Sequence, residues 1–270
     1  MELLSVFCYF ASSNHQQDGL MSDKTNDINK KLIALYEPYF EALCTKNNMD
    51  KNRRNPLLIK CPEHYFDQGN IRIMVIGKDT ARWFKKNSAK DVEECQNLYE
   101  SFYKDGYKSE SGNEEQFNFI KKLNKRINNT ANVDNIVWTN VYKTTETIAP
   151  SRNIPDSLQK RKEWRKMQYK ITHKEIDILD PQFVFFITGD STQNDTEYII
   201  PVFENQNLNF TDIKEDNAMA MVVGIDSKLK FICLRLPDPK NKDNYATVIE
   251  HTKTFVKNHQ KNHYVDKCYN

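Results

Sequence analysis

The stretch from Asn70 to Phe84, N-I-R-I-M-V-I-G-K-D-T-A-R-W-F, is the feature that most constrains how this chain can fold. It contains an apolar, mostly β-branched run about as long as a buried parallel strand, and this run ends at Gly77. Lys78, Asp79 and Thr80 follow directly. Because open α/β sheets bind ligands at the carboxyl ends of their strands, we expect Asp79 to point into a crevice there.

Further apolar runs predict three more strands, at 136–141, 183–187 and 228–234. Apolar residues at helical spacing predict the intervening helices, at 30–43, 89–104, 114–127, 158–179 and 245–257. Parallel neighbours in a sheet need crossover connections. The alternation therefore predicts an α/β protein, a three-layer α/β/α sandwich with a mainly parallel, four-stranded central sheet.

With 270 residues the chain is long enough for one large domain. We expect a single domain over 30–270, preceded by a poorly ordered extension over 1–29. The apolar patch at 3–11 lacks a basic flank and is far shorter than the roughly 20 residues of a membrane span. We therefore expect no membrane contact and a cytoplasmic location.

The six cysteines are scattered, with no C-x-x-C pair and no spacing typical of a zinc or iron-sulfur site. We expect reduced thiols, no metal and no cofactor. The sequence also lacks G-x-G-x-x-G, the Walker lysine motif, H-E-x-x-H and G-x-S-x-G, which argues against dinucleotide enzymes, P-loop ATPases, zincins and standard serine hydrolases. A net charge of +2 does not indicate a nucleic-acid binder, so any basic surface must be local, as at 160–166.

Taken together, the strand-end segments resemble the uracil-DNA glycosylase superfamily. Gly77-Lys-Asp-Thr-Ala81 stands where the classical enzymes have Gly-Gln-Asp-Pro-Tyr, and 77–83 is closer still to the Gly-Gln-Glu-Thr-Asn-Gly-Trp form of a bacterial branch. Trp138-Thr-Asn140 resembles the strand whose terminal Asn reads the flipped base. Residues 176–189 resemble the helix, Pro, strand and Gly that precede the DNA-contacting part. The similarity covers about residues 55–255 as an ordered set of motifs.

This resemblance implies a uracil-DNA-glycosylase-like fold and a monofunctional DNA glycosylase, which flips a pyrimidine out of DNA and hydrolyses its N-glycosidic bond. Such cleavage builds positive charge on the sugar and negative charge on the leaving base. Asp79 would orient water and stabilise the sugar cation, while Asn140 would offer donors and an acceptor to the base. The other expected base-binding residues are Gly77, Lys78, Ala81, Trp83 and Phe84, and Phe102 is a further candidate for stacking.

The sequence departs from the family at its second motif, a His-Pro-Ser-type loop. The corresponding stretch, 236–239, reads Leu-Pro-Asp-Pro and has no histidine. Either Arg235, Lys240 or another donor takes that role, or Asp238 stands at the histidine position and the leaving group differs, or activity has been lost. Lys78 replaces the family Gln and could contact the base or a phosphate. The remaining expected contacts with DNA are Lys143, Thr144 and Gly189.

Ala81 replaces the classical Tyr that blocks the C5 position of the base. A pocket that cannot exclude a C5 substituent can be built to receive one. Some bacterial members of this superfamily remove modified pyrimidines from phage DNA. We therefore weigh a C5-modified cytosine, hydroxymethylated or glucosylated, as highly as uracil, with an antiviral role as one setting for such base excision.

Simpler interpretations exist for each of these residues. Asp79 could cap the following helix, Asn140 could form a turn, and the basic cluster at 160–166 could be a solvated helix face. The main alternative function is a non-catalytic member of the same fold that binds DNA or a modified base. A weaker third option is a small-molecule α/β hydrolase that acts on nucleosides. DNA is the expected partner in the first two cases, and we expect a monomer.

Overall fold

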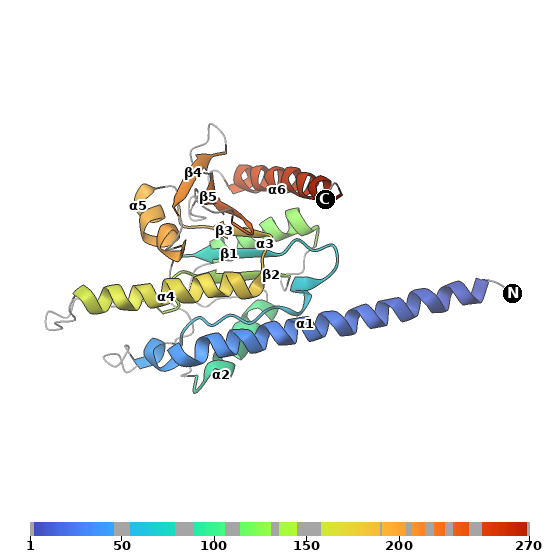
Figure 1. The fold of residues 1–270 in the computed structure, drawn as a ribbon, viewed down its shortest axis with the longest axis horizontal. Coiled ribbons are helices and arrows are strands. Elements are labelled where there is room, and N and C mark those ends of the chain that lie inside the picture. The colour runs from blue at the N-terminus through green and yellow to red at the C-terminus, as the bar shows by residue number, and fades with distance from the viewer. Residues whose placement is uncertain are drawn as a thin grey trace.

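A computed structural model gives the fold of the chain (Figure 1). It describes residues 3–45, 55–78, 89–105, 114–130, 135–144, 158–189, 191–203, 207–213, 219–224, 229–237 and 245–268.

Six strands form one mixed sheet in the order β2-β1-β3-β6-β5-β4. β1 pairs in parallel with β2 and β3, and β3 pairs in parallel with β6, so the four strands expected from apolar runs form the parallel part. The predicted α/β class is confirmed. The bounds are β1 (Ile73–Gly77), β2 (Ile136–Asn140), β3 (Phe183–Phe186), β4 (Leu208–Asp212), β5 (Ala220–Gly224) and β6 (Ile232–Arg235).

The prediction of only four strands is wrong, because β4 and β5 add an antiparallel extension beside β6. In β4 the half-buried Leu208 and Phe210 alternate with the exposed Asn209 and Thr211. This alternation is typical of an antiparallel strand with one face on the core. A search for continuous apolar runs finds strands buried on both faces, such as β1, and misses a strand of this kind.

Helices cover both sides of the sheet: α4 and α1 lie on one side, and α3 and α6 on the other (Figure 1). The helix expected at 30–43 is part of a much longer α1, whose N-terminal part extends away from the rest of the molecule (Figure 1). None of the helices in the described part of the chain combines the length and apolar character that a membrane crossing requires. The bounds are α1 (Leu3–Thr45), α2 (Val92–Lys104), α3 (Glu114–Asn128), α4 (Leu158–Leu179), α5 (Thr192–Asn194) and α6 (Tyr245–Cys268), with short 3-10 turns at Glu63–Phe66 and Ile200–Phe203 and a π-helical turn at Asp195–Ile199.

α2 covers the outer edge of β2 with a tyrosine. The Tyr99 hydroxyl accepts a hydrogen bond from the Trp138 backbone N–H at 3.1 Å and donates one to the Trp138 carbonyl at 2.8 Å. This contact pairs the N–H and C=O of Trp138, two of the backbone groups that face away from β1 at this edge. Phe102, one turn further along α2, is 4% exposed and packs edge-on against Phe117. Phe102, a candidate for stacking on an extruded base, therefore lies in the core of the ligand-free chain.

Removing the Tyr99 hydroxyl should lower the free energy of unfolding. Y99F removes both hydrogen bonds of the hydroxyl with the buried backbone of Trp138, which should cost about 1–3 kcal/mol in denaturant unfolding. Y39F, at a half-buried tyrosine of α1, is the matched control and should change stability by less than about 0.5 kcal/mol. Equal effects of the two substitutions would contradict the role given to Tyr99.

Candidate functional site

The carboxyl ends of the four parallel strands lie level with one another. Gly77 at the end of β1 is the direct neighbour of Asn140 at the end of β2. On the other side, the Leu236 N–H just after β6 donates to the Phe186 carbonyl at the end of β3, at 2.7 Å. The segments that follow these strands therefore lie at the same end of the sheet, as the sequence predicts. We call residues 77–78, 140–144, 188–189 and 235–237 the carboxyl edge.

The side-chain amides of Asn140 and Gln116 lie close to the backbone of Gly77. A Cβ atom on Gly77 would lie 2.3 Å from Asn140 Oδ1 and 3.0 Å from Gln116 Nε2. Only glycine leaves room for the Asn140 amide at this position. Gln116 comes from α3 and was not singled out from the sequence, because nothing in the α3 pattern shows that this residue faces the end of β1.

Asn140 itself is 1% exposed, so its amide is shielded from solvent in the ligand-free chain. Hydrogen bonds are stronger in such a low-dielectric environment than in water. A ligand can reach this amide only if the residues that cover it move.

The segment after β2 is held along its whole length. The N–H groups of Val141 and Tyr142 continue the β1 ladder and donate to the carbonyls of Gly77 and Lys78 at 2.9 and 3.1 Å. The next two N–H groups, of residues 143 and 144, donate to a single side-chain oxygen, Gln168 Oε1, at 2.7 and 3.1 Å. Four consecutive backbone donors beyond the strand are thus paired, which is unusual for a connecting segment.

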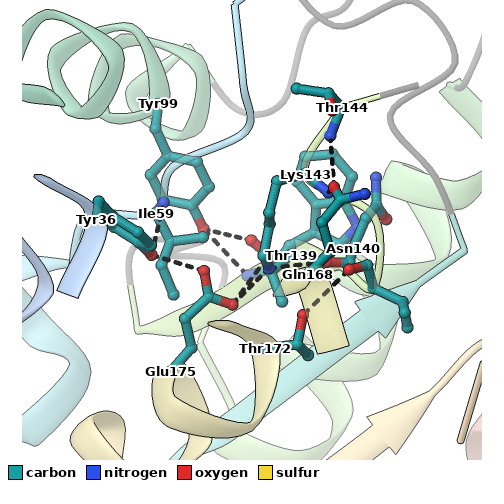
Figure 2. Close-up of polar contacts among 12 residues, drawn as sticks. Tyr36, Ile59, Tyr99, Thr139, Asn140, Lys143, Thr144, Gln168, Thr172 and Glu175 are labelled. Atoms are coloured by element: carbon teal, nitrogen blue, oxygen red, sulfur yellow. Dashed lines mark hydrogen bonds and ion pairs between the residues drawn. The ribbon is translucent and has the colours of Figure 1, made fainter. Parts of the chain in front are cut away.

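These contacts come from one polar stripe on α4. Gln168, Thr172 and Glu175 follow one another at helical spacing and all three are fully buried. Thr172 Oγ1 donates to the Val141 carbonyl at 3.2 Å, one helical turn along α4 from Gln168, which binds residues 143 and 144 (Figure 2). α4 therefore presents hydrogen-bonding groups, instead of hydrocarbon, to the end of β2.

Lys143 lies inside this network, and its exposed fraction is 0%. Its ammonium donates to Thr139 Oγ1 at 2.6 Å, to the Asn140 carbonyl at 2.7 Å and to Glu175 Oε2 at 2.5 Å (Figure 2). Burial lowers the pKa of Lys143 and raises the pKa of Glu175, while the attraction between the two groups opposes both shifts. The expectation that Lys143 contacts DNA is corrected, because its charge is enclosed and paired.

Thr144 and Arg235 were also expected to contact DNA, and both are buried. Thr144 is 3% exposed and its N–H is one of the two bound by Gln168. Arg235 is 6% exposed, and its Nη1 donates to Asp195 Oδ2 at 2.6 Å. Asp195 belongs to the π-helical turn after β3, so this ion pair fixes that turn to β6 instead of presenting a cation to a nucleic acid.

Gly189 lies at the carboxyl edge as expected, with φ of +94° and with its N–H donating to the Leu236 carbonyl at 3.3 Å. This left-handed conformation favours glycine and brings the segment after β3 against the segment after β6. Lys78 is half-buried, and its ammonium lies 5.8 Å from the centre of the Tyr198 ring. Tyr198 in turn contacts Tyr142 edge-on at a ring separation of 5.7 Å. Lys78 is thus placed beside the Tyr198 ring, which itself contacts Tyr142 after the end of β2.

Six of the predicted site residues lie outside the described residues: Asp79, Ala81, Trp83, Phe84, Asp238 and Lys240. Their roles stay predictions.

The contacts of α4 are the main feature that the sequence analysis missed. A signal was present, because Gln168, Thr172 and Glu175 form a polar stripe at helical spacing within a helix that is otherwise buried on that side. What the sequence could not show is which strand end the stripe faces.

A methyl group at Gly77 tests whether the close approach of Asn140 is real. G77A should lower the free energy of unfolding by about 1–3 kcal/mol, because the new Cβ would overlap the Asn140 amide oxygen. In the N140A background the same substitution should cost much less, giving a coupling energy of about 0.5–3 kcal/mol in a double-mutant cycle. Additive effects of G77A and N140A would show that the two residues do not touch.

No protein-family model and no curated protein matches this chain. Within the described residues, no group of three or more His, Cys, Asp or Glu side chains could hold a metal ion. The cysteines Cys44, Cys61, Cys95 and Cys233 are buried and form no disulfide.

Proposed function

We propose that this chain is a DNA glycosylase that flips a pyrimidine out of DNA and hydrolyses its N-glycosidic bond, leaving an abasic site. The observation that carries the proposal is the position of Asn140, opposite Gly77 at the carboxyl ends of two neighbouring parallel strands. Open α/β sheets bind their ligands at this side. An amide there offers two donors and an acceptor, which suits the Watson-Crick edge of a pyrimidine.

The way in which Asn140 is held also supports a recognition role. Its own carbonyl and the next four backbone N–H groups are all hydrogen-bonded. A group that discriminates between bases must be fixed before the ligand arrives, because a loosely held amide would adapt to the wrong base. In this proposal the base enters after the residues that cover Asn140 move aside.

Basic residues near the start of α4 are the proposed contacts for the DNA backbone. Lys162 and Lys166 are exposed, and the guanidinium of Arg165 lies 5.9 Å from the Tyr142 ring centre, beside the carboxyl edge. Cationic side chains near phosphates supply most of the sequence-independent affinity for DNA. These residues replace Lys143 and Arg235, whose charges are enclosed.

Asp79 is the proposed catalytic carboxylate, and either uracil or a C5-modified cytosine is the proposed base, with Ala81 providing room at C5. The second candidate function is a non-catalytic protein of this fold that binds DNA or a modified base. The ion pair of Arg235 with Asp195 favours this candidate, because it removes one of the donors that could stabilise the leaving base in place of the missing histidine.

The direct test uses duplexes that carry uracil, 5-hydroxymethylcytosine, glucosylated 5-hydroxymethylcytosine or unmodified cytosine. The protein should convert at least one of the first three into abasic sites, which alkali then cleaves, and should spare unmodified cytosine. Binding without cleavage on every duplex would support the non-catalytic candidate and contradict the enzyme. Cleavage of free nucleosides alone would instead indicate a small-molecule hydrolase.

Asp79 is tested by D79N, which keeps the size of the side chain and removes its charge. Turnover should fall by about a hundredfold or more, because the sugar cation loses its carboxylate, while affinity for the duplex should be retained. D27N, at an exposed carboxylate of α1, is the control and should leave turnover unchanged. Unchanged turnover in D79N would show that another residue supplies the catalytic charge.

A further inference from the structure

The ammonium of Lys143 and both carboxylate oxygens of Glu175 have hydrogen-bond partners. All three acceptors of the Lys143 ammonium lie within 2.7 Å, and one of them is the carbonyl of Asn140. The second carboxylate oxygen, Glu175 Oε1, accepts from the Tyr36 hydroxyl of α1 at 2.6 Å (Figure 2). The pair therefore connects α1 and α4 with the backbone of Asn140.

The two charges of this pair make contacts that an apolar pair could not make. Burial lowers the pKa of Lys143 and raises that of Glu175, so each charge is disfavoured where it lies. Buried ion pairs are often no more stabilising than apolar side chains of the same volume. What an apolar pair could not do is donate a hydrogen bond to the Asn140 carbonyl.

That hydrogen bond completes the fixation of Asn140. The residue pairs with β1 through the strand register, and its side chain lies against Gly77. The ammonium donates to its backbone carbonyl, at 2.7 Å. Because the ammonium is itself held by a carboxylate from α4, it cannot turn away to another acceptor without leaving Glu175 unpaired.

We propose that Lys143 and Glu175 are positioning residues for base recognition: the carboxylate clamps the ammonium, and the ammonium sets the Asn140 peptide so that its side-chain amide lies over Gly77. The inference rests on the proposed function of Asn140. Neither residue touches the base in this account. Their effect reaches the base only through Asn140.

The test compares K143M, E175Q and the double variant K143M/E175Q with the wild type. Each single variant leaves one buried charge without its partner and should lower the midpoint of denaturant unfolding. The double variant removes both charges, and the introduced amide still offers an oxygen to the Tyr36 hydroxyl, so part of the loss in midpoint should be recovered. The lost hydrogen bond to the Asn140 carbonyl keeps the midpoint below that of the wild type. The kcat/KM of the double variant should nevertheless stay at least about tenfold below wild type, with reduced discrimination between the preferred base and unmodified cytosine, since one aligned contact is worth about this much.

Recovery of kcat/KM and of base discrimination together with stability would overturn the proposal, because the pair would then be purely structural. K60M/E100Q is the control, since Lys60 and Glu100 form a half-buried ion pair between α2 and the segment that precedes β1. It should leave base discrimination unchanged. A loss of discrimination in this control would show that any change in charge pairing has that effect, and would also contradict the proposal.

A second readout separates this inference from the proposed function. If wild-type protein cleaves no duplex, the glycosylase proposal fails, and the position of Asn140 is followed by NMR instead. Its side-chain NH₂ signals are identified as those missing from the N140D spectrum. In K143M/E175Q these signals should shift relative to wild type, whereas in K60M/E100Q they should not. Unshifted Asn140 signals in K143M/E175Q would refute the positioning role whether or not the protein is an enzyme.

Discussion

The hydrogen bonds from α4 to the end of β2 are the constraint on which the rest of the structure depends. Backbone N–H and C=O groups that leave a strand inside a protein must find new partners, because an unpaired buried group costs about 1–3 kcal/mol. Gln168, Thr172 and Glu175 supply those partners directly or through Lys143. Since Tyr36 binds the same carboxylate, the position of α1 is tied to this contact as well.

The consequence is a carboxyl edge whose charges are divided between two tasks. Lys143 and Arg235, each paired with a carboxylate, hold elements together and are enclosed. Lys78 and Arg165 are half-buried and lie beside the rings of Tyr198 and Tyr142, while Lys162 and Lys166 of α4 are exposed. In the proposed glycosylase the first group would keep the recognition amide in place and the second would meet the nucleic acid. The carboxyl edge would then be rigid and would also attract the phosphates of a nucleic acid.

The parallel part of the fold could be predicted from the sequence, because strands buried on both faces, such as β1, have an unbroken apolar pattern. β4 could not be found in this way, since only every second side chain faces the core. The site was harder to predict. The level ends of Gly77 and Asn140 follow from parallel pairing, but Lys143 was misplaced because nothing local shows that a carboxylate 32 residues later faces it. Buried ion pairs between distant segments depend on tertiary packing, which a local pattern does not record.

The central claim is that the end of β2 is locked before any ligand binds, and amide hydrogen exchange of residues 141–144 tests it most directly. Although these residues follow the strand, all four N–H groups are hydrogen-bonded. The account predicts that they exchange as slowly as the amides of β1. Exchange of the amides of residues 143 and 144 as fast as that of the exposed Asn129, while β1 stays protected, would contradict the claim.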